Sequence, residues 1–164
     1  MTDSEMIRQL RTSSDETRQH VAVNDPARGA YRRAAVVFAL LLASTGLVAL
    51  VVSMDVPVTG RFGHGLAGLT VNRATGVLLV VLAGLTAASA ILPGNRGAVA
   101  LTGAGMLMLL TGLFFLTFSR TDANIVAFSV VDVSALWVVA MGVLWCGLHL
   151  WEAADDEPRT LAGR

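Results

Sequence analysis

Four long stretches without a single charged residue dominate this chain. Residues 34–54, 74–93, 97–119 and 133–151 contain no Asp, Glu, Lys or Arg, and they are rich in Leu, Val, Ala and Gly. Each stretch has about the 20 residues that an α-helix needs to cross a hydrocarbon core roughly 30 Å thick. The sequence therefore predicts an all-α membrane protein with four transmembrane helices.

The composition supports this fold class and excludes others. Hydrophobic residues make up 54% of the 164 residues and charged residues 15%, with a mean hydropathy of +0.65. These values are too apolar for an ordinary soluble domain. The formal net charge is zero, so no overall positive field attracts nucleic acid, and no nucleic-acid partner is expected. All twelve basic residues are arginine, which, with the high Ala, Gly and Val content, is typical of a high-GC bacterial genome.

The distribution of arginine predicts the orientation in the membrane. Nine of the twelve arginines lie before the first span, in the short turn between the second and third spans, or after the fourth span. The positive-inside rule therefore predicts that both termini lie in the cytoplasm. Together with the bacterial composition, this predicts a multi-pass protein of the bacterial plasma membrane. On this topology residues 1–33 form a polar, mostly disordered tail, residues 34–151 form the transmembrane domain, and residues 152–164 form an acidic tail.

Small residues along each span predict where the helices touch. Lipid provides no hydrophobic force between helices, so close approach of backbones at small residues carries the packing. The residues expected to make these contacts are Gly46, Ala83, Ala87, Gly105, Gly112, Gly142 and Cys146. Gly142 is expected to lie against another helix, and Val143 on a neighbouring face that tolerates a larger side chain. The predicted arrangement is a compact antiparallel four-helix bundle.

The chain resembles itself when it is shifted by 59 residues. At this shift Thr75 meets Ser134. Residues 69–71, 74–77 and 79–80 meet residues 128–130, 133–136 and 138–139 with similar size and polarity. A duplication of this kind predicts two tandem helical hairpins of the same orientation. Chance similarity between apolar helices is the alternative explanation.

The loop before the second span is rich in glycine and apolar residues. Its four glycines between residues 60 and 68 argue against a stable helix. The segments 69–72 and 128–131 are extended candidates, and we expect them to pair as a short cap over the bundle. Phe62 and Phe128 are expected to lie buried beneath this cap.

Charged residues near the second and fourth spans define a possible contact face. Asp132 is well placed to cap the fourth helix at its N-terminus. Asp122 and Asp132 are also candidates for ion pairs with Arg61 or Arg73. This face is where a ligand or partner is expected to bind, and its candidate residues are Arg61, Phe62, His64, Arg73, Phe128 and Asp132.

The sequence carries no catalytic, cofactor-binding or metal-binding signature. His149, one turn after Cys146, would need further ligands to bind haem or zinc, and His20 and His64 lie in a tail and in a loop across the membrane. We expect His149 to be an interfacial side chain and His64 to be a loop residue with local hydrogen bonds. No charged residue lies within a span to mark a proton or ion path. We therefore expect no enzymatic activity, no cofactor and no metal.

Sequence segments around the second and fourth spans resemble a known family. They are Leu-Thr-Val-Asn at 69–72 leading to Leu-Ala-Gly-Leu at 82–85, and Met-Gly-Val-Leu at 141–144. Over residues 33–151 the chain is similar to the small actinobacterial four-helix membrane proteins of domain-of-unknown-function family 4383. Members carry a histidine one turn before a glycine in the second and fourth helices, where this chain has Val77 and Val138. The resemblance implies the four-helix fold and no known activity.

Two functions are compatible with these features. The first is a non-enzymatic accessory or structural subunit that contacts itself or another membrane protein through its helices. The alternative is a small carrier or channel for neutral or amphipathic solutes, suggested by the tandem repeat. A carrier predicts a continuous polar cavity at mid-membrane, whereas a packing subunit predicts a filled core and an exposed face of small residues.

Overall fold

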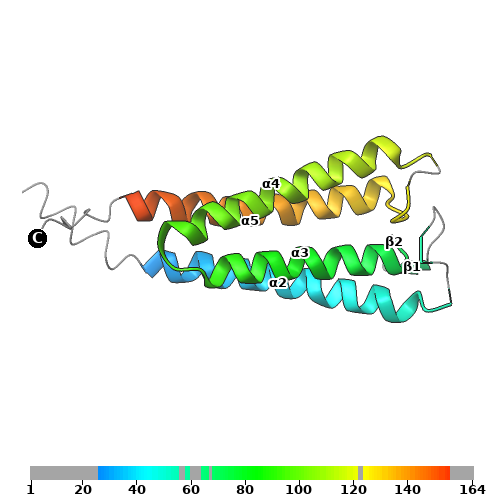
Figure 1. Ribbon diagram of the computed structural model, residues 1–164, viewed down its shortest axis with the longest axis horizontal. Coiled ribbons are helices and arrows are strands. Elements are labelled where there is room, and N and C mark those ends of the chain that lie inside the picture. The colour runs from blue at the N-terminus through cyan, green and yellow to red at the C-terminus, as the bar shows by residue number, and fades with distance from the viewer. Residues whose placement is uncertain (1–25, 56–57, 60–63, 67, 122–123, 156–164) are drawn as a thin grey trace, which may run out of the picture.

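Four long helices make up most of the computed structural model (Figure 1). The structure describes residues 26–55, 58–59, 64–66, 68–121 and 124–155. The helices are α2 (Pro26–Val52), α3 (Arg73–Ile91), α4 (Gly94–Phe118) and α5 (Val130–Asp155). All four are long and apolar enough to cross a membrane, which confirms the predicted all-α fold with four membrane-spanning helices.

The helices form two antiparallel hairpins that lie side by side. α2 packs along α3, α4 packs along α5, and smaller contacts join α2 to α5 and α3 to α4. Leu92 and Pro93 alone connect α3 to α4. Consecutive helices therefore alternate in direction, which confirms the antiparallel bundle and its two tandem hairpins. We call the end of the bundle with the 92–93 connection the turn end, and the opposite end, with residues 53–72 and 119–129, the loop end.

The helices α2 and α5 extend beyond the predicted apolar segments. α2 begins at Pro26, well before residue 34, because proline suits the first helical position, where its missing N–H has no partner to lose. Arg32 Nη2 donates to the Leu92 carbonyl at 3.0 Å and ties this extension to the 92–93 connection. α5 continues to Asp155, past residue 151. The predicted boundaries mark where the apolar sequence ends, and both helices continue past that point into polar sequence.

A short β-hairpin precedes α3 at the loop end. β1 (His64–Leu66) pairs antiparallel with β2 (Leu69–Val71), with Gly65 opposite Thr70. Gly68 in the turn has a φ of 87°, which glycine adopts without steric cost. The prediction that segment 69–72 pairs with segment 128–131 is wrong, because β2 finds its partner next to it in sequence and residues 130 and 131 belong to α5. Phe128 is buried, as expected, and Phe62 lies outside the described residues.

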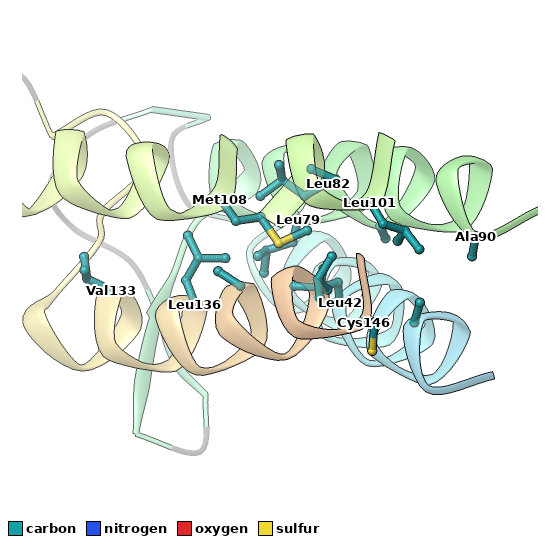
Figure 2. Packing of buried hydrophobic residues seen from close by; sticks show 14 of the residues in the cluster. Leu42, Leu79, Leu82, Ala90, Leu101, Met108, Val133, Leu136 and Cys146 are labelled. Atoms are coloured by element: carbon teal, nitrogen blue, oxygen red, sulfur yellow. The ribbon is translucent and has the colours of Figure 1, made fainter. Parts of the chain in front are cut away.

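Apolar side chains fill the interior between the two hairpins. Figure 2 shows labelled side chains from all four helices directed into the space that the helices enclose. Leu101, Met108 and Val143 are completely buried there. The residues of this core include Leu42, Leu79, Leu82, Leu101, Met108, Leu136 and Val143.

The buried stripe of α5 differs from the predicted one. Val143 is completely buried, whereas Gly142 is half-buried. The expectation that Val143 lies on a tolerant face is therefore wrong. The physical reason is that the centre of this bundle is wide enough to need branched side chains, while small residues are needed only where two backbones meet.

The burial patterns of α3 and α5 coincide at a shift of 57 residues, not 59. At 57 the buried residues Gly76, Leu79, Ala83, Thr86, Ser89 and Ala90 fall on the buried residues Val133, Leu136, Ala140, Val143, Cys146 and Gly147. At 59 the buried Thr75 falls on Ser134, which lies at the same end of the bundle but is exposed. The sequence match at a shift of 59 depends on hydroxyl and β-branched residues. Such residues occur both on buried and on exposed faces of these helices, so they do not identify equivalent positions.

Candidate functional site

Reciprocal hydrogen bonds fix the first turn of α3 and of α5. Asn72 Oδ1 accepts from Thr75 N at 2.9 Å, and Asn72 N donates to Thr75 Oγ1 at 3.4 Å. Before α5, Ser129 N donates to Asp132 Oδ2 at 2.6 Å, and Asp132 N donates to Ser129 Oγ at 3.3 Å. Both are capping boxes, which satisfy N–H groups that have no partner within the helix. Asp132 thus caps α5 from the third residue of the helix.

Three further hydrogen bonds join these two helix starts to each other. They are Thr70 N to Asp132 Oδ1 at 3.0 Å, Asn72 Nδ2 to the Ile125 carbonyl at 2.9 Å, and Thr75 Oγ1 to the Val126 carbonyl. We call Thr70, Asn72, Thr75 and Asp132 the polar clasp. Asn72, Thr75 and Asp132 are only 0%, 2% and 6% exposed. Since an unpaired buried polar group costs about 1–3 kcal/mol, the clasp holds the two hairpins in one arrangement at the loop end.

Asn124 shapes the loop that receives these bonds. Its Nδ2 donates to the Phe128 carbonyl at 2.7 Å, and its Oδ1 accepts from Phe128 N at 3.0 Å. Between them Ala127 has a φ of 53°, in the left-handed region that side chains other than glycine rarely adopt. The two Asn124 bonds hold the chain in this conformation and so present the loop carbonyls to the clasp.

An apolar pocket of about 200 Å³ lies beside the polar clasp. Its walls come from both hairpins: Leu42 of α2, Leu79 of α3, and Leu136 of α5 line it together with Val71 and Phe128. Three polar side chains also reach it, those of Thr45, Thr75 and Asp132. The pocket is therefore a mainly hydrocarbon-lined space with a polar rim at the loop end.

The structure brings together only some of the residues predicted for a contact face. Phe128 and Asp132 both line the pocket. Arg73 begins α3, and its Nε donates to the Ser53 carbonyl at 3.1 Å. The proposed ion pair between Arg73 and Asp132 does not form, because the Asp132 carboxylate accepts from Thr70 and Ser129. His64 lies in β1 with its side chain outside the described part, and Arg61, Phe62 and Asp122 lie outside the described residues.

The turn end carries an aromatic stack instead of a polar site. His149 stacks on Tyr31 of α2, with ring centroids 4.9 Å apart and an interplanar angle of 6°. Trp145 meets the same imidazole edge-on at 4.5 Å. In the described part of the chain, no three His, Cys, Asp or Glu residues gather closely enough to hold a metal ion. The stack joins α2 to α5 at the turn end of the bundle.

Glycines bring α4 and α5 into backbone contact. A Cβ atom added to Gly105 would lie 2.8 Å from Leu144 N, and one added to Gly147 would lie 2.6 Å from Thr102 N. Both distances are shorter than real Cβ atoms show, and the neighbouring atoms belong to backbone. Gly105 was among the predicted packing residues, and Gly147 was not.

The other predicted packing residues have different neighbours. A Cβ on Gly46 would lie 2.9 Å from the Gly76 carbonyl oxygen of α3, so two backbones also meet in the first hairpin. Gly112 lies against the Trp137 indole, and Gly142 lies against the Phe38 ring. Ala83 and Cys146 are buried in the core, and Ala87 is half-buried.

Comparisons with known proteins add no relative. No protein-family model, no curated protein and no solved structure matches the chain. The resemblance to family 4383 stays a prediction. The fold and its four apolar helices define the class, a multi-pass membrane protein.

Proposed function

We propose that this protein is a non-enzymatic accessory or structural subunit of the bacterial plasma membrane, acting through lateral helix–helix contacts with a second copy or another membrane protein. The observation that carries the proposal is the exposed glycine on each of two neighbouring helices. Gly84 of α3 and Gly103 of α4 are exposed, and a Cβ added to either would meet nothing within 4 Å. At 1.5 Å per residue, both lie about 10 to 14 Å from the turn end. Small residues at matching depth let a further helix approach closely.

The filled interior supports this proposal over a transport function. Leu101, Met108 and Val143 occupy the middle of the bundle with no exposed surface. Figure 2 shows Leu79 and Leu82 of α3 near Met108 and Leu101 of α4. A solute that crossed along the bundle axis would have to displace these side chains. The outward surfaces, in contrast, carry many large apolar residues, among them Val77 and Val138, which suit lipid or a partner helix.

Replacing Gly84 with leucine is expected to weaken lateral association about tenfold, because the larger side chain keeps a second helix away from the backbone. The measurement is Förster transfer between donor- and acceptor-labelled copies in liposomes at decreasing protein-to-lipid ratios. Val81→Leu is the matched control, since Val81 is 52% exposed on the same helix and already large. Unchanged transfer for Gly84→Leu and Gly103→Leu would reject this face as the contact surface between copies.

The proposed orientation rests on the arginine distribution and has its own test. In a Cys146→Ala background, a cysteine at the exposed Thr121 is expected to react with an impermeant thiol reagent in intact cells. A cysteine at the exposed Asn95, in the first turn of α4, is expected to react only after the cells are permeabilised. The reverse labelling would place the termini outside the cytoplasm.

A carrier for neutral or amphipathic solutes is the second candidate function, and the pocket beside the clasp is the observation that favours it. Such a carrier would release an entrapped solute from proteoliposomes faster than from empty liposomes. It would also need the pocket to open toward the turn end, where Leu82 and Leu101 now close the interior.

A further inference from the structure

The pocket beside the polar clasp opens sideways between α2 and α5. Two of its lining residues, Leu41 of α2 and Ala135 of α5, are exposed on the outer surface of the bundle. Both helices are candidate membrane spans. In a membrane the medium at this opening is therefore the lipid hydrocarbon, and not water.

The pocket runs from the interface into the hydrocarbon region. Asp132, the third residue of α5, lies at its loop end, and Val139 lines it two turns further along the same helix. The rise of an α-helix places these residues about 10 Å apart along the membrane normal. A lipid has the same layout, with a polar head at the interface and a chain below it.

The polar groups in the pocket can only accept further hydrogen bonds, because both threonine hydroxyls already donate to backbone carbonyls and a carboxylate has no donor. Thr45 Oγ1 donates to the Leu41 carbonyl at 2.9 Å, and Thr75 Oγ1 donates to the Val126 carbonyl. The Asp132 carboxylate accepts three hydrogen bonds, two of them on Oδ2 and one on Oδ1. A carboxylate has about four acceptor positions, so one position on Oδ1 is not used by any hydrogen bond from the described residues. A matching head group must therefore donate an N–H or O–H.

We infer that this pocket binds one hydrocarbon chain of a membrane lipid whose head group donates a hydrogen bond to Asp132. The volume of about 200 Å³ exceeds the roughly 150 Å³ of an apolar cavity that takes up benzene, so it accepts part of one chain. Leu42, Leu79 and Leu136 supply the apolar walls that the chain contacts. The inference is independent of the proposed contacts at Gly84 and Gly103, which lie on other surfaces.

The test uses the purified full chain in phosphatidylcholine nanodiscs with a small amount of a photoreactive lipid. Three probes share one acyl chain, which carries a diazirine in its upper half, and differ in the head: ethanolamine, a free glycerol hydroxyl, or choline. Adducts located by mass spectrometry are expected at the pocket residues Leu41, Leu136 and Val139. Choline has no N–H or O–H, so its probe is expected to label these residues about tenfold less. A tenfold change in affinity is what the loss of one hydrogen bond to a charged acceptor is expected to cause. The ethanolamine and hydroxyl probes separate an amine head from an alcohol head.

Two variants with the same substitution control for general lipid contact. Ala135→Trp fills the opening of the pocket from an exposed position and is expected to reduce pocket adducts at least fivefold. Ala88→Trp adds the same side chain to an exposed position on α3, away from the pocket, and is expected to leave the adducts unchanged. Adducts spread evenly over exposed residues such as Leu40 and Leu47, or unchanged adducts in Ala135→Trp, would overturn the site. Equal labelling by the choline probe would overturn the role of Asp132.

Discussion

Replacing Gly105 with alanine is expected to lower the free energy of unfolding by about 1 to 3 kcal/mol, the usual cost of overpacking a close contact. The new Cβ would lie 2.8 Å from Leu144 N and 2.9 Å from Leu144 Cα. Backbone atoms cannot rotate away as the end of a side chain can, so α4 and α5 must move apart. The measurement is unfolding in sodium dodecyl sulfate followed by tryptophan fluorescence, to which Trp137 at the same helix pair contributes.

Two matched glycines show whether backbone contact is the cause. Gly103→Ala changes the same helix, but its Cβ would meet nothing within 4 Å. Alanine also favours the helix by about 1 kcal/mol over glycine, so this variant is expected to be neutral or more stable. The three atoms nearest to a Cβ on Gly142 all belong to the Phe38 ring, which can shift, so the effect of Gly142→Ala is expected to lie between the other two. A loss at Gly103 equal to that at Gly105 would mean that the α4–α5 contact does not limit stability.

The helices and their order could be predicted because the relevant signals are local. A span is set by the length of an apolar run, which the sequence displays directly. The 92–93 connection is too short for any arrangement except an antiparallel neighbour. The ends of α2 and α5 were less predictable, since Pro26 and Asp155 lie in polar sequence that continues an existing helix.

The buried face of a helix was predicted correctly only where its small residues are also its buried residues. In α3 and α4 many glycines and alanines lie on the buried face, as at Ala83 and Gly105, although Gly84 and Gly103 are exposed. In α5 the interior is filled by Val143 and Leu136, while Gly142 is half-buried. A small residue can therefore indicate where two helix backbones meet, but residue size does not identify the larger side chains that fill the wider centre of the bundle.

The polar clasp could not be predicted because its partners are distant in sequence and are mostly backbone groups. Asn72 and Ile125 are separated by 53 residues, and a carbonyl acceptor leaves no mark on the residue type that carries it. The local signals were the two capping boxes, of Asn72 with Thr75 and of Ser129 with Asp132. These boxes fix the starts of α3 and α5, but they do not reveal the second partner of the Asn72 side chain.

Replacing Asn72 with alanine is expected to lower the free energy of unfolding by about 2 to 4 kcal/mol. The loss has two parts, because the side chain caps α3 through Thr75 N and also bonds the Ile125 carbonyl. An N-cap contributes typically about 1 kcal/mol, and a buried carbonyl without a donor costs about 1–3 kcal/mol. Unfolding in sodium dodecyl sulfate measures the sum. Ser44→Ala is the control, since the exposed Ser44 hydroxyl donates to the Leu41 carbonyl of its own helix.

A second substitution separates the cap from the bond between the hairpins. Serine caps helices about as well as asparagine, but it is too short to reach Ile125 and has no amide donor. Asn72→Ser is therefore expected to recover only the cap, leaving about 1–3 kcal/mol of the loss. Asn124→Ala disrupts the same loop through Phe128, so its effect together with Asn72→Ala is expected to be smaller than the sum of the two. Full recovery by serine, with additive effects of Asn72→Ala and Asn124→Ala, would reduce Asn72 to a helix cap and remove its role in joining the hairpins.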